Sequence, residues 1–123
     1  MKVRTFKPMT EPVEDELGNH YVLKTPDEDA YCEWNDARIR QAKFDDSTGK
    51  VIVQHDKLYK STRALLVGLC LYRLDENGGQ LPGSVGEQFV RDTFDPPSIS
   101  KMYNWLMEAG GFMADGLDDA KKS

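Results

Sequence analysis

The strongest pattern in the chain is a series of mostly apolar positions at helical spacing in its middle. From about Asp56, these positions form a broad stripe at helical spacing, at Leu58, Thr62, Leu65, Leu66, Leu69, Cys70 and Tyr72. This spacing predicts an amphipathic helix that ends before the turn sequence at 75–79. Its second half is apolar on nearly every side, so we expect this helix to be central in the domain.

An earlier segment begins like a helix at Thr25. Thr25 can cap, Pro26 fits the first helical position and Glu28 completes a capping box. The first turns are acidic and the last are basic, as the helix dipole favours. The apolar stripe comprises Ala30, Tyr31, Trp34, Ala37 and Ile39. We expect this helix to end near Phe44.

Two further helices are predicted near the C-terminal end. A second capping-box pattern at 84–87 opens a short helix with Val85, Phe89 and Val90 inward. Prolines 96 and 97 should break it. Ser98 then starts a last helix, stopped by the glycines at 110–111, whose apolar face comprises Ile99, Met102, Tyr103, Leu106 and Met107.

The remaining patterned segments are short and favour β structure. Residues 2–7 alternate basic and less polar side chains before Pro8, as a half-buried strand would, and 20–24 offer a second strand. Segment 50–54 could be a strand or merely extended chain. The fold class expected is mainly α (α+β), about four helices with a small N-terminal β-ribbon. One domain should cover 1–114, and 115–123 should form a disordered tail.

Length and composition restrict the class of protein. With 123 residues, the chain suits one domain with its own core. No apolar run approaches the roughly 20 residues that span a bilayer, and the basic N-terminus lacks the apolar stretch of a signal peptide. Cys32 and Cys70 both lie in apolar periodic segments, which favours two reduced core thiols. We therefore expect a cytoplasmic protein without membrane contact.

The net charge of −5 argues against nucleic-acid binding, which requires clustered lysine and arginine. The acids are concentrated in two blocks, at 11–16 and 27–36. The simpler interpretation is a solvated surface. The alternative is a patch for a basic partner or a mimic of DNA, which would require both blocks to share one face.

The sequence contains no complete motif for nucleophilic catalysis, calcium binding or phosphate binding. The two histidines belong to no recognisable nucleophile motif. Segment 75–86 begins like a calcium loop, but Gln80 stands where glycine is needed and Gly86 where the bidentate acid is needed. Residues 46–50 end in Gly-Lys but lack the rest of a phosphate-binding loop. We expect no catalytic residue, no metal, no cofactor and no enzymatic activity.

The large aromatic residues have two interpretations. Trp34, Tyr103 and Trp105 could anchor a protein interface. At helical spacing within apolar stripes, such residues more often belong to the core. Trp105 is the best interface candidate because it lies off the face that Ile99 and Leu106 define.

The order of these patterns resembles the small tail assembly chaperones of long-tailed (siphovirus-type) bacteriophages. The resemblance covers roughly residues 20–112. It is carried by the helix Arg63-Ala64-Leu65-Leu66 that ends in Cys70-Leu71, and by the turn Asp75-Glu76-Asn77-Gly78. A final amphipathic helix contains Asn104 and ends at Ala109-Gly110-Gly111. The resemblance does not extend to the N-terminal basic strand or to the segment at 51–53.

The resemblance implies a protein partner, the tape measure protein or the tail tube protein. Such chaperones keep the apolar, helical tape measure protein soluble during tail assembly. The residues we expect to contact this client are Met102, Trp105, Met107, Phe112 and Met113. A homo-oligomer is left open. The alternatives are a structural virion subunit, such as a head–tail connector or tail terminator, and an acidic inhibitor of a nucleic-acid-binding protein.

Overall fold

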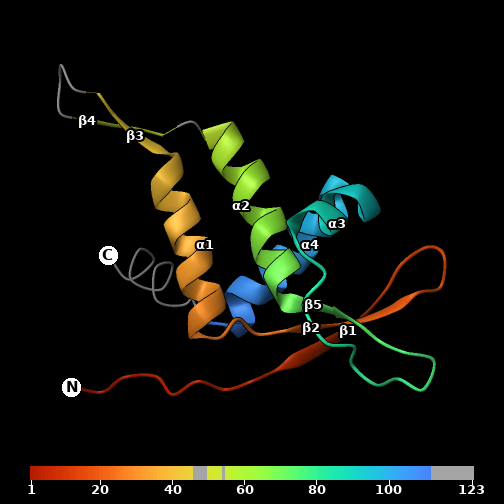
Figure 1. Ribbon diagram of the computed structural model, residues 1–123. Helices are drawn as coiled ribbons and strands as arrows, with labels where there is room; N and C mark the ends of the chain where they lie inside the picture. Colours follow the sequence, from red (N-terminus) through yellow and green to blue (C-terminus); the bar gives the residue numbers. More distant parts are fainter. Residues whose placement is uncertain (46–49, 54, 112–123) are drawn as a thin grey trace.

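The computed structural model describes residues 1–45, 50–53 and 55–111 (Figure 1). Its helices are α1 (Glu28–Gln41), α2 (His55–Cys70), α3 (Glu87–Thr93) and α4 (Pro96–Ala109). Its strands are β1 (Thr10–Glu14), β2 (His20–Lys24), β3 (Ala42–Asp45), β4 (Lys50–Val53) and β5 (Leu71–Arg73). The expectation of an α+β fold with four helices and a small N-terminal β element is confirmed.

Helix α2 is the centre of the arrangement. It contacts α1, α3 and α4, and its last turn leads directly into β5 of the sheet (Figure 1). The fully buried side chains come from every layer around it: Leu23, Trp34, Leu66, Val67, Leu71, Val90 and Leu106. The predicted central position of this helix is therefore confirmed.

Strands β1, β2 and β5 form an antiparallel sheet in which β2 is the middle strand. The outer edge of β5 is covered by the loop that precedes α3. In this loop Leu81 N–H donates to Arg73 O at 2.8 Å, and Val85 N–H donates to Leu71 O at 2.9 Å. Strand β1 is the opposite edge, and no backbone hydrogen bond to its outer side is seen among the described residues.

The register of β1 explains how it accommodates Pro12. The pairs that flank the strand at either end, Met9 with Thr25 and Asp15 with Asn19, are joined by backbone hydrogen bonds. Because hydrogen-bonded pairs alternate along an antiparallel ladder, the odd-numbered residues of β1 bond to β2. The even-numbered residues direct their backbone groups to the open edge. Pro12 has no N–H to donate, and at this position pairing with β2 requires none.

The predicted first strand was misplaced. Residues 2–7 form no strand, whereas β1 lies at 10–14, beyond Pro8, and contains Pro12. The second strand, at 20–24, is confirmed, and β4 shows that 50–53 is a strand. Strand β5 had no separate signal, because its residues continue the apolar pattern of α2.

The limits of the first helix also differ from the prediction. Thr25 does not cap it, since the buried Thr25 hydroxyl accepts a hydrogen bond from Met9 N–H at 3.0 Å. The Asp27 carboxylate instead accepts from Ala30 N–H at 2.9 Å. Helix α1 ends at Gln41, and the chain continues as β3 in a hairpin with β4.

The caps of the last two helices were partly misassigned. Gly86, with no side-chain cap, precedes α3, so Ser84 does not complete a capping box. Helix α4 begins at Pro96, two residues before the predicted Ser98, because Asp95 caps it by accepting from Ser98 N–H at 2.9 Å. Hydrogen bonding by the Ser98 side chain, followed by that of Ser98 N–H, lowers the pKa of the Asp95 carboxyl. Both prolines therefore occupy the first helical turn, where their missing N–H groups cost nothing.

The two cysteines have different environments. Cys70 is buried, and burial raises the pKa of its thiol to about 12. Cys32 is exposed on α1, so the expectation that both thiols belong to the core was wrong for Cys32. Neither is in a disulfide. The predicted tail at 115–123 lies outside the described residues.

The apolar segments form no helix capable of crossing a bilayer within residues 1–45, 50–53 and 55–111. The longest apolar run is instead divided between the end of α2 and the start of β5, where its side chains enter the core.

Gly68 allows α2 to approach the loop before α3. Its carbonyl accepts from Gly86 N–H at 3.0 Å, and a Cβ at position 68 would overlap the backbone of Gly86 and Glu87. We predict that Gly68→Ala lowers the free energy of unfolding by about 1–3 kcal/mol in urea denaturation, as overpacking does. In an uncrowded helix this change would increase stability, so an unchanged or increased midpoint would contradict the close approach.

Candidate functional site

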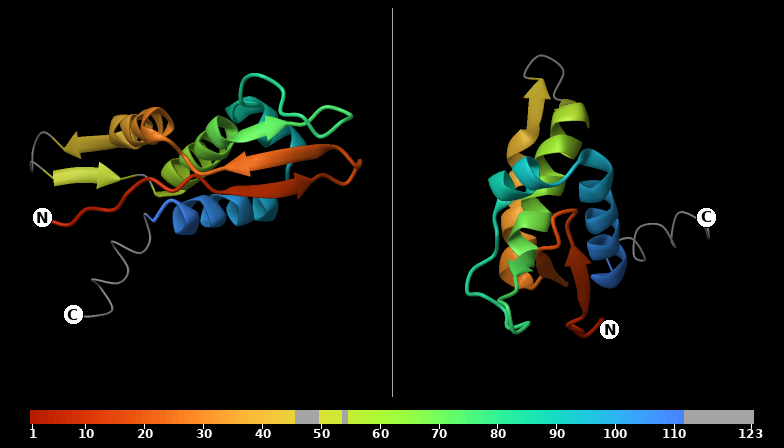
Figure 2. Two further views of the ribbon diagram at one scale, coloured as in Figure 1. Left: turned by 90° about the horizontal axis from the view of Figure 1, so that it is seen from below. Right: turned by 90° about the vertical axis from the view of Figure 1, so that its right-hand side faces the viewer.

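A groove of about 490 Å³ lies between β1 and α4. Apolar side chains from both sides line it: Val13, Leu23, Phe94, Met102 and Trp105. Figure 2 (left) shows α4 beside β1, on the side away from β2. The groove therefore combines an apolar lining with the edge of the three-stranded sheet to which no backbone hydrogen bond is seen among the described residues.

The register places the apolar lining on the inner face of the sheet. Val13 is opposite Tyr21, and Glu11 is opposite Leu23, so these four side chains point to the same face. Tyr21 and Leu23 are buried, whereas Val13 on the edge strand remains half-buried. The apolar face of the sheet thus extends beyond the core and reaches the groove.

Charged side chains surround the apolar lining. Glu11 and Glu14 come from β1, Glu108 comes from the end of α4, and Lys101 is the one cation among the lining residues. Three carboxylates against one ammonium group make the groove acidic. A basic segment with apolar side chains would match both its charge and its lining.

The turn after β1 fixes this wall of the groove. The Asp15 carboxylate accepts hydrogen bonds from the N–H groups of Leu17 and Asn19, from the Asn19 side chain and from Tyr21 Oη. The Asn19 side chain is the main cause that lowers the pKa of Asp15. Tyr21 also packs against the rings of Phe89 and Phe94. The turn is thereby tied to the core beneath the groove.

The structure separates the five residues expected to contact a partner. Trp105 is half-buried and lines the groove, and Met102 lines it with only 7% of its surface exposed. Met102 is therefore mainly a core residue. Met107 is half-buried against the core and does not line the groove. Phe112 and Met113 lie outside the described residues.

The β1 side of the groove was not found from the sequence. The strand was predicted at 2–7, and the segment that contains Glu11, Val13 and Glu14 was considered only as part of the acidic block at 11–16. Of the other aromatic candidates, Trp34 is a core residue, as the simpler interpretation held, with Arg38 over its ring. Tyr103 is half-buried between Trp34 and Arg63.

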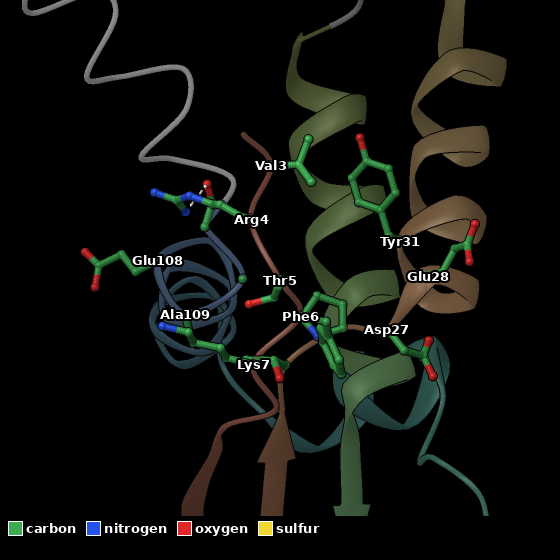
Figure 3. Close-up of a pocket in the computed structure, with 14 residues that line it drawn as sticks. Val3, Arg4, Thr5, Phe6, Lys7, Asp27, Glu28, Tyr31, Glu108 and Ala109 are labelled. Atoms are coloured by element: carbon green, nitrogen blue, oxygen red, sulfur yellow. Dashed lines mark hydrogen bonds between the residues drawn. The ribbon is translucent and has the colours of Figure 1, made fainter. Parts of the chain in front are cut away.

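A second hollow, of about 640 Å³, lies under the N-terminal segment (Figure 3). The segment passes between the start of α1 and the end of α4, with Tyr31 on one side and Glu108 on the other. Arg4 reaches the end of α4, where its Nη1 donates to Gly111 O at 3.3 Å. Val3 and Phe6 nevertheless remain 75% and 60% exposed.

The two acidic blocks do not form a common surface. The turn that contains Asp15 and Glu16 lies at the opposite side of the molecule from α1, which carries the second block (Figure 1). Asp15 and Asp27 also serve the turn and the helix cap as hydrogen-bond acceptors. This arrangement does not favour a mimic of DNA.

Clusters for chemistry are not apparent in the described part of the chain. There, no group of three or more histidine, cysteine or acidic side chains could hold a metal ion. The segment considered as a calcium loop is a tight turn, in which the Asp75 carboxylate accepts from the N–H groups of Asn77 and Gly79. His20 lies 4.0 Å from Glu14 on the exposed end of the ribbon.

The chain matches no protein-family model, no curated protein and no solved structure.

The bond from Tyr21 to Asp15 leads to a test of the turn. Burial is the main cause that raises the pKa of Tyr21 to about 12, and the bond at 2.8 Å adds to it. We predict that Tyr21→Phe lowers the free energy of unfolding at pH 7 by about 0.5–1.5 kcal/mol. Above pH 10 the tyrosine ionises first in the unfolded chain, so the wild type should lose stability between pH 10 and 12.

Urea denaturation of both proteins across this pH range provides the measurement. The variant should lose stability less steeply with rising pH, since it lacks the shifted group. Parallel curves for the two proteins would show that Tyr21 is not the protonated, buried partner of Asp15.

Proposed function

We propose that this chain is a non-enzymatic protein that binds an apolar segment of another polypeptide in the groove between β1 and α4. The observation that supports the proposal is the groove itself, in which Trp105 lies beside an open strand edge. Tryptophan is enriched among the residues that dominate binding energy. An exposed edge can also receive an extended segment through main-chain hydrogen bonds.

Pro12 limits what the edge can bind. Only its carbonyl is available there, so an added strand would form an incomplete ladder on β1. Proline and charged residues on an edge strand suppress uncontrolled association between sheets. The apolar lining must then supply much of the affinity, which favours a client recognised by its apolar side chains.

For the particular client, we propose the tape measure protein of a long-tailed bacteriophage, with this chain as its tail assembly chaperone. The support is the resemblance carried by Arg63–Leu71, by the turn at 75–78 and by the final helix. Asn104 of that helix is exposed and lies at the groove. An apolar helical client aggregates unless its apolar stripe is covered, and acidic residues around the groove would keep the complex in solution.

The groove can be tested with a synthetic amphipathic peptide of leucine and lysine. We predict that Trp105→Ala raises the dissociation constant of the peptide at least about tenfold, as loss of a hot spot does. Asn104→Trp should also weaken binding, because it fills the mouth of the groove from an exposed position. Calorimetric titration measures each affinity, and circular dichroism verifies that each variant is folded.

Ile39→Ala is the matched control, because Ile39 is an exposed apolar residue (62%) on α1, outside the groove. It should leave the affinity unchanged. Unaltered peptide binding in both groove variants would rule out the groove. For the chaperone role, co-expression with the tape measure protein should increase the soluble yield of that protein, and purified virions should lack this chain. Its presence in virions would favour a structural subunit.

A further inference from the structure

The outer edge of β1 has the backbone geometry that receives an extended segment. Its even-numbered residues direct their backbone groups away from β2, so Thr10 and Glu14 each offer an N–H and a C=O, and Pro12 offers a C=O. All three residues are exposed. A segment can therefore pair along the whole of β1, with one donor missing at Pro12.

The side chains of such a segment would alternate between the two faces of the sheet. Residues directly opposite Glu11 and Val13 point to the face that carries these two side chains, because opposite residues in a sheet share a face. That is the face beside α4, where Trp105 lies half-buried in the groove (Figure 2). The residues between them point to the other face, where Glu14 lies 4.0 Å from His20.

The two ends of the groove differ in polarity. Helix α4 runs in the direction opposite to β1 (Figure 2, left), so its start lies beside the end of β1. There Phe94 packs against Tyr21, the residue opposite Val13, with ring centroids 5.6 Å apart. Glu108, near the end of α4, lies towards Glu11 at the start of β1. One end of the groove is therefore apolar, and the other is acidic.

We propose that the client binds as an extended strand added antiparallel to β1, in the order apolar, any residue, basic from its N-terminus. This binding mode rests on the proposed function and specifies the conformation and sequence that the groove recognises. The apolar side chain lies opposite Val13 and against Trp105, and main-chain hydrogen bonds hold the strand. The basic side chain lies opposite Glu11 and meets Glu108.

The sheet itself favours the antiparallel direction. Both of its strand pairs are antiparallel, and such pairing is slightly more stable per residue than parallel pairing. Parallel addition would require the reverse order, with the basic residue before the apolar one. A client segment that is held extended cannot be helical at the same time, so a helical client must be released before it assembles.

N-methylation of a synthetic peptide tests the added strand. The probe, called the alternating peptide, is a capped Thr-Leu-Thr-Lys-Thr, whose three threonine N–H groups would face β1 while the other two face away. N-methylation of the threonines should raise the dissociation constant at least about tenfold. N-methylation of the leucine and lysine should change it by less than about threefold. Chemical-shift titration of the full chain measures these affinities, including weak ones.

Reversing the order or the charge tests the proposed side-chain match. The reversed peptide, Thr-Lys-Thr-Leu-Thr, should bind at least about fivefold more weakly, and so should a peptide with glutamate in place of lysine. In the variant Glu11→Lys, Glu108→Lys the glutamate peptide should bind more tightly than the alternating peptide. The matched control, Glu33→Lys with Glu76→Lys, reverses two exposed acids outside the groove and should still prefer lysine.

The outcomes separate this binding mode from the proposed function. Equal effects of the two N-methylations, tighter binding of the reversed peptide, or no binding of the alternating peptide would overturn the antiparallel strand. If a leucine–lysine peptide at helical spacing then still binds and depends on Trp105, the groove and the proposed function stand, and a helix occupies the site. Failure of every peptide to bind would overturn both.

Discussion

The structure depends on burying most of the apolar run from Ala64 to Leu71. Within it, Ala64, Leu66, Val67, Cys70 and Leu71 are each buried almost completely. The run is too short to span a bilayer and too apolar for a surface helix. It is therefore covered by α1, α3, α4 and the sheet, whose buried residues Trp34, Val90, Leu106 and Leu23 form one cluster with it.

This burial determines which sheet edge is left open. The run passes from helix to strand at Cys70 and Leu71, so β5 begins at the core and must pair with β2. The chain then returns to α3 past Gly68, whose carbonyl holds the loop against α2, while the N–H of Val85 bonds the loop to Leu71 of β5. One edge is thereby covered by the loop that the core requires. The other edge, β1, is left beside α4.

The helical part of the fold could be predicted because periodicity and chain breakers act locally. The strands could not be predicted equally well, since their identity depends on partners distant in sequence. Pro12 appears to end a strand unless one knows that its nitrogen faces an open edge. Leu71 appears to continue the helix unless one knows that it pairs with Leu23 of β2. Thr25 has the pattern of a cap, but its hydroxyl bonds to Met9 of a neighbouring strand.

The residues of the candidate site also divide into those that a local pattern predicts and those that depend on partners distant in sequence. Trp105 could be predicted, because its position off the apolar face of α4 follows from helical geometry alone. Met102 was placed on the same surface, yet the packing of the sheet covers it. The other wall, with Glu11, Val13 and Glu14, depends on the register between β1 and β2, which a single sequence does not specify.

The open edge also constrains how the molecule can associate. Pro12 withholds one donor, so a complete strand cannot be added to β1 without losing a hydrogen bond. An occupant must recover that loss from side-chain contacts with the apolar lining or from the carboxylates around it. Both features are selective, since an acidic segment is repelled by the carboxylates and a wholly polar segment gains nothing from the apolar lining. The incomplete edge therefore favours specific partners over general strand addition.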